Sequence, residues 1–213
     1  MSPLVASLHA EGLAVLGRCP VEAADGLPGW VESLALVGPS GPEFWAVFSA
    51  SEEASDGAPD PLDRWSRRVL DGVAKGVDGL ALFPFGGPPW HPFIAWALRT
   101  GVVWTSPVGL LVHREHGLFV SFRGAIALRD PAPPPSGVSP CETCAGQPCR
   151  TACPPAALSI AGYDVPACHA HLDTSDGASC LSGCLVRRAC PVGQDLRPRA
   201  QSAFHMQAFH RSD

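Results

Sequence analysis

The spacing of hydrophobic residues predicts several helices along the chain. Ser2 followed by Pro3 is a typical helix start, because serine caps free amides and proline suits the first helical position. After Asp60-Pro61, apolar residues recur at helical spacing and predict the longest helix, which ends at about Lys75. Further helices are expected after Gly41-Pro42, from about His91 to Arg99, and from Pro198 to His210.

Short apolar runs between these helices predict strands. They cover Leu13–Leu16, Leu34–Val37, Gly79–Phe83, Val108–His113, Leu118–Arg123 and Ala125–Leu128. The connection from Arg114 to Gly117 has the length of a hairpin loop, with a glycine where a positive φ is expected. Residues 51–59 are small and acidic, and are expected to form a surface loop. The pattern predicts an α+β chain whose first part is an α/β domain.

Residues 131–140 contain five prolines, one glycine and two serines, a composition typical of a stiff linker. We therefore expect a domain boundary here. The predicted α/β domain covers residues 1–130, a cysteine-rich module covers residues 141–195, and residues 196–213 form a C-terminal helix and tail.

The cysteine-rich module contains the clearest chemical signal. Eight of the nine cysteines lie within it, and the first four follow the spacing C-x2-C-x4-C-x3-C-P. The bacterial ferredoxin run is C-x2-C-x2-C-x3-C-P, so this chain adds two residues before the third cysteine. In such runs three close cysteines bind one cubane and the fourth reaches the other cluster. The remaining four cysteines also end in Cys-Pro, which predicts two [4Fe–4S] clusters.

The crossed pairing assigns four cysteines to each cluster. The first set is Cys141, Cys144, Cys149 and Cys190, and the second set is Cys153, Cys168, Cys180 and Cys184. His169 and His171 lie close to Cys168, so either is an alternative ligand to a cysteine. Cys19 lies far from the module and is expected to be a buried apolar residue.

The cysteines have two alternative interpretations. A structural zinc protein is one alternative, although zinc ribbons favour paired C-x2-C knuckles and only the first pair here has that spacing. Disulfides are the other, because eight is an even number. Residues 1–9 show no basic segment, apolar run and cleavage site, so no secretory signal is expected and a cytoplasmic location is predicted.

Composition narrows the classes of partner. The chain has 213 residues, a net charge of −5 and no apolar run long enough for a membrane span. Nothing indicates a strongly basic nucleic-acid binder. Five of the six arginines among or after the cysteines lie at positions 150, 187, 188, 197 and 199. They could offset cluster charge or form a docking patch, and we expect a ferredoxin, flavodoxin or reductase as redox partner.

Residues 97–128 (A-L-R-T-G-V-V-W-T-S-P-V-G-L-L-V-H-R-E-H-G-L-F-V-S-F-R-G-A-I-A-L) resemble a segment of the epoxyqueuosine reductases. So do the cysteines after them, including the single Cys168 after Tyr163-Asp164. Residues 110–128 and the D-P-L-D helix start at Asp60 also resemble the cobalamin-processing (cyanocobalamin decyanase) family, and the reductive dehalogenases share the overall plan. The chain lacks a counterpart of the epoxyqueuosine reductases' catalytic aspartate and of their helical repeats, so a short form with a different activity is expected.

The resemblance implies a nitroreductase-like α/β domain that holds cobalamin, followed by a ferredoxin-like module with two clusters. It implies a cobalamin-like pocket within residues 85–128, for which the candidates are Trp90, His91, Trp104 and His113. The first hypothesis is therefore an iron–sulfur electron-transfer protein. The alternative is a cobalamin-dependent reductase or cobalamin-processing enzyme in which the clusters reduce bound cobalt. No catalytic residue is assigned.

Overall fold

The computed structural model describes residues 2–211, which form two compact units. The first unit contains the chain up to Val103 and the segment Ser121–Gly137. The second contains Trp104–Val120 and the chain from Val138 onward. The later boundary falls within the predicted linker. The segment 104–120 differs from the linear division expected from the sequence, because it belongs to the same unit as the cysteine-rich module and not to that of the α/β domain.

The first unit is built on a four-stranded antiparallel sheet. Its strand order is β1 (Leu13–Pro20), β2 (Ser33–Pro39), β6 (Gly124–Leu128) and β3 (Leu80–Leu82). Every residue of the two central strands β2 and β6 is buried, so both faces of the sheet are covered. Cys19 on β1 has no exposed surface, which confirms the prediction that it is a buried residue.

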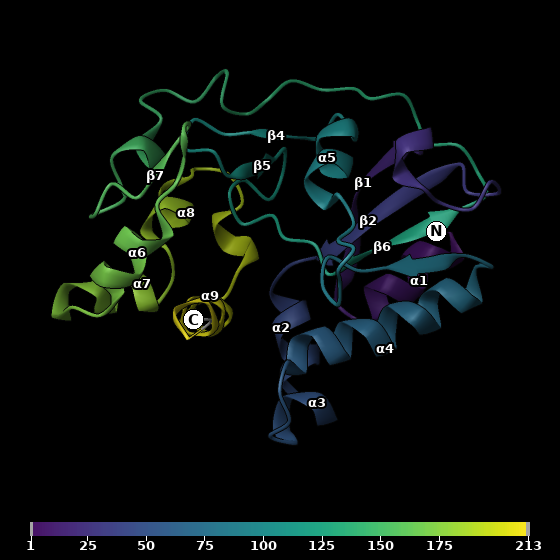
Figure 1. The fold of residues 1–213 in the computed structure, drawn as a ribbon, viewed down its shortest axis with the longest axis horizontal. Coiled ribbons are helices and arrows are strands. Elements are labelled where there is room, and N and C mark those ends of the chain that lie inside the picture. The colour runs from purple at the N-terminus through teal and green to yellow at the C-terminus, as the bar shows by residue number, and fades with distance from the viewer. Residues whose placement is uncertain (1, 212–213) are drawn as a thin grey trace. The chain divides into compact units, whose positions relative to one another are not determined.

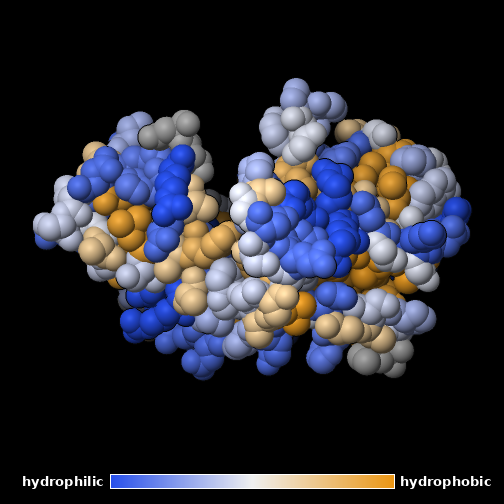
Figure 2. Space-filling view, turned by 90° about the horizontal axis from the view of Figure 1, so that it is seen from below, coloured by the Kyte–Doolittle hydropathy of each residue, from blue (hydrophilic) through white to orange (hydrophobic). Residues whose placement is uncertain are grey.

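Helices cover the two faces of this sheet. Figure 1 shows α1 (Pro3–Ala10) and α4 (Pro61–Gly76) on one side and α5 (Phe93–Arg99) on the other. The predicted apolar stripe of α4 is buried, and Trp65 packs edge-on against Phe44 of α2 (Pro42–Ser49), with ring centroids 5.5 Å apart. The outward face of α4 is charged, and Figure 2 shows a hydrophilic band across the first unit on this side.

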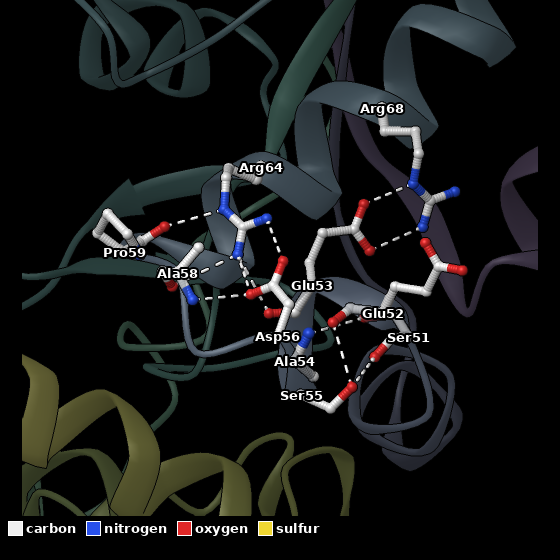
Figure 3. Close-up of polar contacts among 10 residues, drawn as sticks. All are labelled: Ser51, Glu52, Glu53, Ala54, Ser55, Asp56, Ala58, Pro59, Arg64 and Arg68. Carbon is white, nitrogen blue, oxygen red and sulfur yellow. Dashed lines mark hydrogen bonds and ion pairs between the residues drawn. The ribbon is translucent and has the colours of Figure 1, made fainter.

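The predicted loop 51–59 contains a short helix, α3 (Glu52–Ser55), which is a correction to the sequence prediction. Ion pairs fix this turn against α4. Figure 3 shows Arg68 pointing toward Glu53, with contacts of 2.5 and 3.0 Å, and Arg64 toward Asp56, with contacts of 2.7 and 2.8 Å. The hydrogen bonds from Arg68 lower the pKa of Glu53 to about 2. The local sequence pattern does not predict this helix, because the contacts that stabilise it come from Arg64 and Arg68 of α4.

The second unit is built from short elements. Its strands are β4 (Val103–Thr105, which begins in the first unit), β5 (Leu111–His113), β7 (Leu158–Ser159) and β8 (Gly162–Tyr163). Its helices are α6 (Val165–Leu172), α7 (Ala178–Leu181), α8 (Leu185–Ala189) and α9 (Arg199–His210). Four 3-10 turns complete the described elements of the chain: η1 (Ala23–Asp25), η2 (Pro148–Arg150), η3 (Ser175–Gly177) and η4 (Gln194–Leu196). None of the helices in the described residues is both long and apolar enough to cross a membrane.

The strand predicted over residues 118–123 is not formed. The hairpin closes with a bridge between His113 and Gly117, and the chain then leaves the strand path. The carbonyl groups of Leu118 and Phe119 accept hydrogen bonds from the side chains of Arg187 and Arg197. Side-chain donors therefore satisfy the backbone groups that a strand partner would otherwise pair.

Candidate metal centre

The first set of cysteines lines a small cavity in the second unit. Its members are Cys141, Cys144, Cys149 and Cys190. The two extra residues in the C-x4-C spacing form an additional turn, because Gly146 and Gln147 both have positive φ, at 73° and 38°. The turn is followed by η2, which carries Cys149, while Cys190 ends α8. The longer spacing is therefore compatible with three cysteines facing one cavity.

The wall of this first cavity is mainly apolar. It includes Val112 and Leu118 from the 104–120 segment, together with Val192 and four prolines. The segment approaches closely at Gly117, where a side chain would lie 2.9 Å from the sulfur of Cys190 and 2.2 Å from the carbonyl oxygen of Val192. The sequence predicts the positive φ at Gly117, and the structure has it at 52°. The sequence alone does not reveal that this glycine lies against a cysteine.

The second set lines a separate small cavity, also in the second unit. Its members are Cys153, Cys168, Cys180 and Cys184. Cys168 lies on α6, Cys180 on α7, and Cys184 at the start of α8. Thus α8 links the two sets, since Cys184 precedes it and Cys190 follows it. The structure brings the eight cysteines together as the crossed pairing groups them.

Hydrogen-bond donors contact the sulfur atoms of the second set. The Tyr163 hydroxyl donates to Cys168 Sγ at 3.2 Å, and the Ala157 amide donates to Cys153 Sγ at 3.3 Å. The Leu185 amide and the Ser179 side chain also bond to Cys180. Tyr163 was not predicted as a site residue. The signal available in the sequence was its position, because it lies five residues before a candidate ligand.

Burial raises the pKa of Cys141 and Cys149 in the first set and of Cys168 and Cys180 in the second. Repulsion between thiolates raises these values further, and it acts only between members of the same set. Four desolvated thiolates around one cavity are therefore unfavourable without positive charge. A bound metal centre supplies that charge, and its binding would release the protons.

The partly buried Arg187 lies in the same unit and interacts with the charge of Cys184. Burial lowers the pKa of its guanidinium, and the charge of Cys184 acts in the opposite direction. It donates a hydrogen bond to the carbonyl group of Leu118. Arg187 thus joins the 104–120 segment to α8 and places a positive charge near the second set.

The four candidates for a cobalamin-like pocket do not belong to one compact unit. Trp90 and His91 line a cavity of about 260 Å³ in the first unit, together with Arg67, Asp71, Phe83 and Phe85. Trp104 and His113 lie in the second unit. Trp104 packs on the apolar residues around the first cysteine set, and His113 is buried with Nδ1 accepting the amides of Glu115 and His116, both at 3.0 Å. Their described contacts are structural.

The two histidines near Cys168 have different surroundings. His169 packs edge-on against Phe209, with ring centroids 4.5 Å apart, whereas His171 lines the second cavity. Within residues 2–211, no three side chains among histidine, cysteine, aspartate and glutamate lie close enough together to hold a single metal ion. In comparisons with known proteins, no family model, no curated protein and no solved structure matches this chain.

Proposed function

We propose that this chain is an electron-transfer protein that binds two [4Fe–4S] clusters, one in each cysteine-lined cavity. The observation that carries the proposal is the separation of eight cysteines into two sets of four around two cavities. The sets follow the crossed order of a two-cluster ferredoxin, in which each Cys-Pro cysteine completes the site of the other group. The resemblance of the module to that of the epoxyqueuosine reductases agrees with this assignment.

No group of three close ligands occurs among the described residues, and this favours a cluster over zinc. A zinc ion holds four sulfurs at about 2.3 Å from one point, which forces them into mutual contact. A cubane holds its thiolates farther apart, because each binds a different iron. Each set of four cysteines here lines one cavity.

When bound, the clusters supply one-electron redox chemistry, and the protein provides ligands, exclusion of water and hydrogen bonds to sulfur. The two cavities share one apolar environment. Cys149 and Cys190 of the first set and Cys153 and Cys184 of the second belong to the same hydrophobic cluster, which also contains Val186. An apolar core shared by both sites would keep water away from the clusters and favour electron exchange between them.

The experiment is metal and sulfide analysis of anaerobically purified protein. Two cubanes predict about eight irons and eight acid-labile sulfides per chain, with a broad visible absorption. Cys19→Ala is the matched control, because Cys19 is buried outside the module, and it should retain the full content. Zinc without sulfide would overturn the proposal and favour a structural zinc protein.

A second candidate is a cobalamin-linked reductase or cobalamin-processing enzyme. The observation that favours it is the cavity of about 260 Å³ in the first unit, which Trp90 and His91 line with Arg67. Trp90 is 64% exposed and is therefore available to stack on a ligand. Titration of cobalamin should shift its absorption spectrum, and Trp90→Ala should weaken that binding. An unchanged spectrum at saturating protein would eliminate this candidate.

A further inference from the structure

The two cysteine-lined cavities differ in the polar side chains that reach them. The first is lined by aliphatic residues and prolines, with Ser106 and Gln147 as its polar members, and Gln147 is bonded to Arg150 and to the Cys141 carbonyl. The Ser139 side chain is its one side-chain donor to a cysteine sulfur among the described contacts, at Cys141. The second is lined by Tyr163 and His171 in addition to its cysteines. Both are hydrogen-bonding groups that the proposed ligand sets leave unused.

Tyr163 is held in place to donate to sulfur. Its hydroxyl lies 3.2 Å from Cys168 Sγ, and its ring stacks on Phe209, with ring centroids 5.9 Å apart and 19° between planes. The stacked ring holds the hydroxyl in this position. The hydroxyl is therefore a fixed donor beside a proposed ligand.

His171 lies three residues after Cys168 on α6, so the two side chains share a face of the helix. Its Nε2 atom is buried and has no hydrogen-bond partner within residues 2–211. A buried unpaired nitrogen costs about 1–3 kcal/mol. Because the ring lines the second cavity, a cluster sulfur is the acceptor that would satisfy it.

We propose that Tyr163 and His171 are positioning residues that raise the reduction potential of the second site, which makes it the electron-accepting member of the pair. This inference rests on the proposed function. Hydrogen bonds to the sulfurs of a cluster stabilise its reduced state, which carries one more negative charge. An external one-electron donor protein supplies the electron, the first site passes it on and is reoxidised, and the second site is reduced. No bond breaks, and neither residue transfers its proton.

The test is a redox titration of the anaerobic holoprotein, followed by electron paramagnetic resonance. Tyr163→Phe removes only the hydroxyl, so the higher-potential couple should fall by about 59 mV, a tenfold loss of electron affinity, while the lower couple stays in place. His171→Leu should act in the same direction, and His171→Asn should restore part of the potential. Ser106→Ala, in the first cavity, should leave the higher couple unchanged.

A second experiment uses a change that should raise the reduction potential of the second site. Tyr163 is the only tyrosine in the chain, so fluorotyrosine supplied during expression alters this hydroxyl alone. Its more acidic hydroxyl is a stronger donor, and the higher couple should rise. The inference is overturned if neither Tyr163→Phe nor His171→Leu moves the higher couple, or if Tyr163→Phe moves the lower couple. A protein without any cluster signal would instead contradict the proposed function.

Discussion

The two compact units are stabilised by different means. The first has strands of up to eight residues and a 16-residue helix, which bury a continuous aromatic and aliphatic core. The second has strands of two or three residues and helices of four to twelve residues. Isolated helices of this length and two-stranded sheets are marginal in water, so such a module needs further stabilisation. The comparison indicates that the periodic hydrophobic pattern stabilises the first unit, and we propose that clusters bound by the cysteines stabilise the second.

Removal of the metal is expected to produce the largest difference between the two units. Under oxidising conditions with a chelator, amides of the second unit should lose protection from hydrogen exchange by about a hundredfold or more, because metal binding contributes folding free energy. The sheet and α4 of the first unit serve as the internal control and should remain protected. Equal loss in both units, or no loss in the second, would show that the units do not differ in this way.

The reverse perturbation is Trp65→Ala in the core of the first unit. Trp65 is 1% exposed and packs against Phe44 and Phe48, so its loss should cost about 3–5 kcal/mol of unfolding free energy. Iron content should be unchanged. Trp30→Ala is the control, because Trp30 mainly contacts Arg129 through a cation–π interaction worth about 0.5–1 kcal/mol. Urea unfolding followed by circular dichroism measures both, and equal costs would contradict the account.

Gly117→Ala tests the contact of the 104–120 segment with the first cysteine set. The new side chain would meet the Val192 carbonyl and the Cys190 sulfur, and the positive φ adds strain, for a cost of about 1–3 kcal/mol. Iron of the first site should be lost first. Gly146→Ala has the same type of backbone strain but nothing within 4 Å, so it separates strain from collision. Equal iron content in the two variants would argue against this contact.

The smallest expected effect is that of Glu53→Gln on α3. In the folded protein the pKa of Glu53 is about 2, below its ordinary value of 4.5. Its ion pair with Arg68 is therefore fully present above pH 4.5 and is lost as the pH falls toward 2. The substitution should cost about 1 kcal/mol at neutral pH and nothing near pH 2. Unfolding curves across this range, with the neighbouring Glu52→Gln as control, measure it, and a cost independent of pH would contradict it.

The same contrast explains how far the sequence predicts the fold. The buried stripe of α4 and the strands β1, β2 and β6 follow from the local sequence, because their apolar residues are the ones that the structure buries. The segment 118–123 also reads as a strand. Its carbonyls are instead taken by Arg187 and Arg197, about seventy residues later, which no local pattern reveals.

The sequence predicts how the cysteines of the candidate site are grouped, but it does not predict the residues that surround them. The Cys-Pro spacing alone groups the cysteines as the structure does, because each run is short and its turns are local. The wall formed by Val112 and Leu118, and the donors Tyr163 and His171, depend on tertiary contacts. Of the predicted cobalamin candidates, only Trp90 and His91 share a cavity. Whether that cavity binds cobalamin stays a prediction.

The most direct test of the central claim is iron and sulfide analysis of two variants that each delete one set. Cys141→Ser with Cys144→Ser should abolish the first site, and Cys180→Ser with Cys184→Ser the second. Each variant should retain about four irons and four sulfides, and its spectrum should show one cubane. A full complement in either variant, or zinc in place of iron with no sulfide, would contradict the assignment of two independent four-cysteine cluster sites.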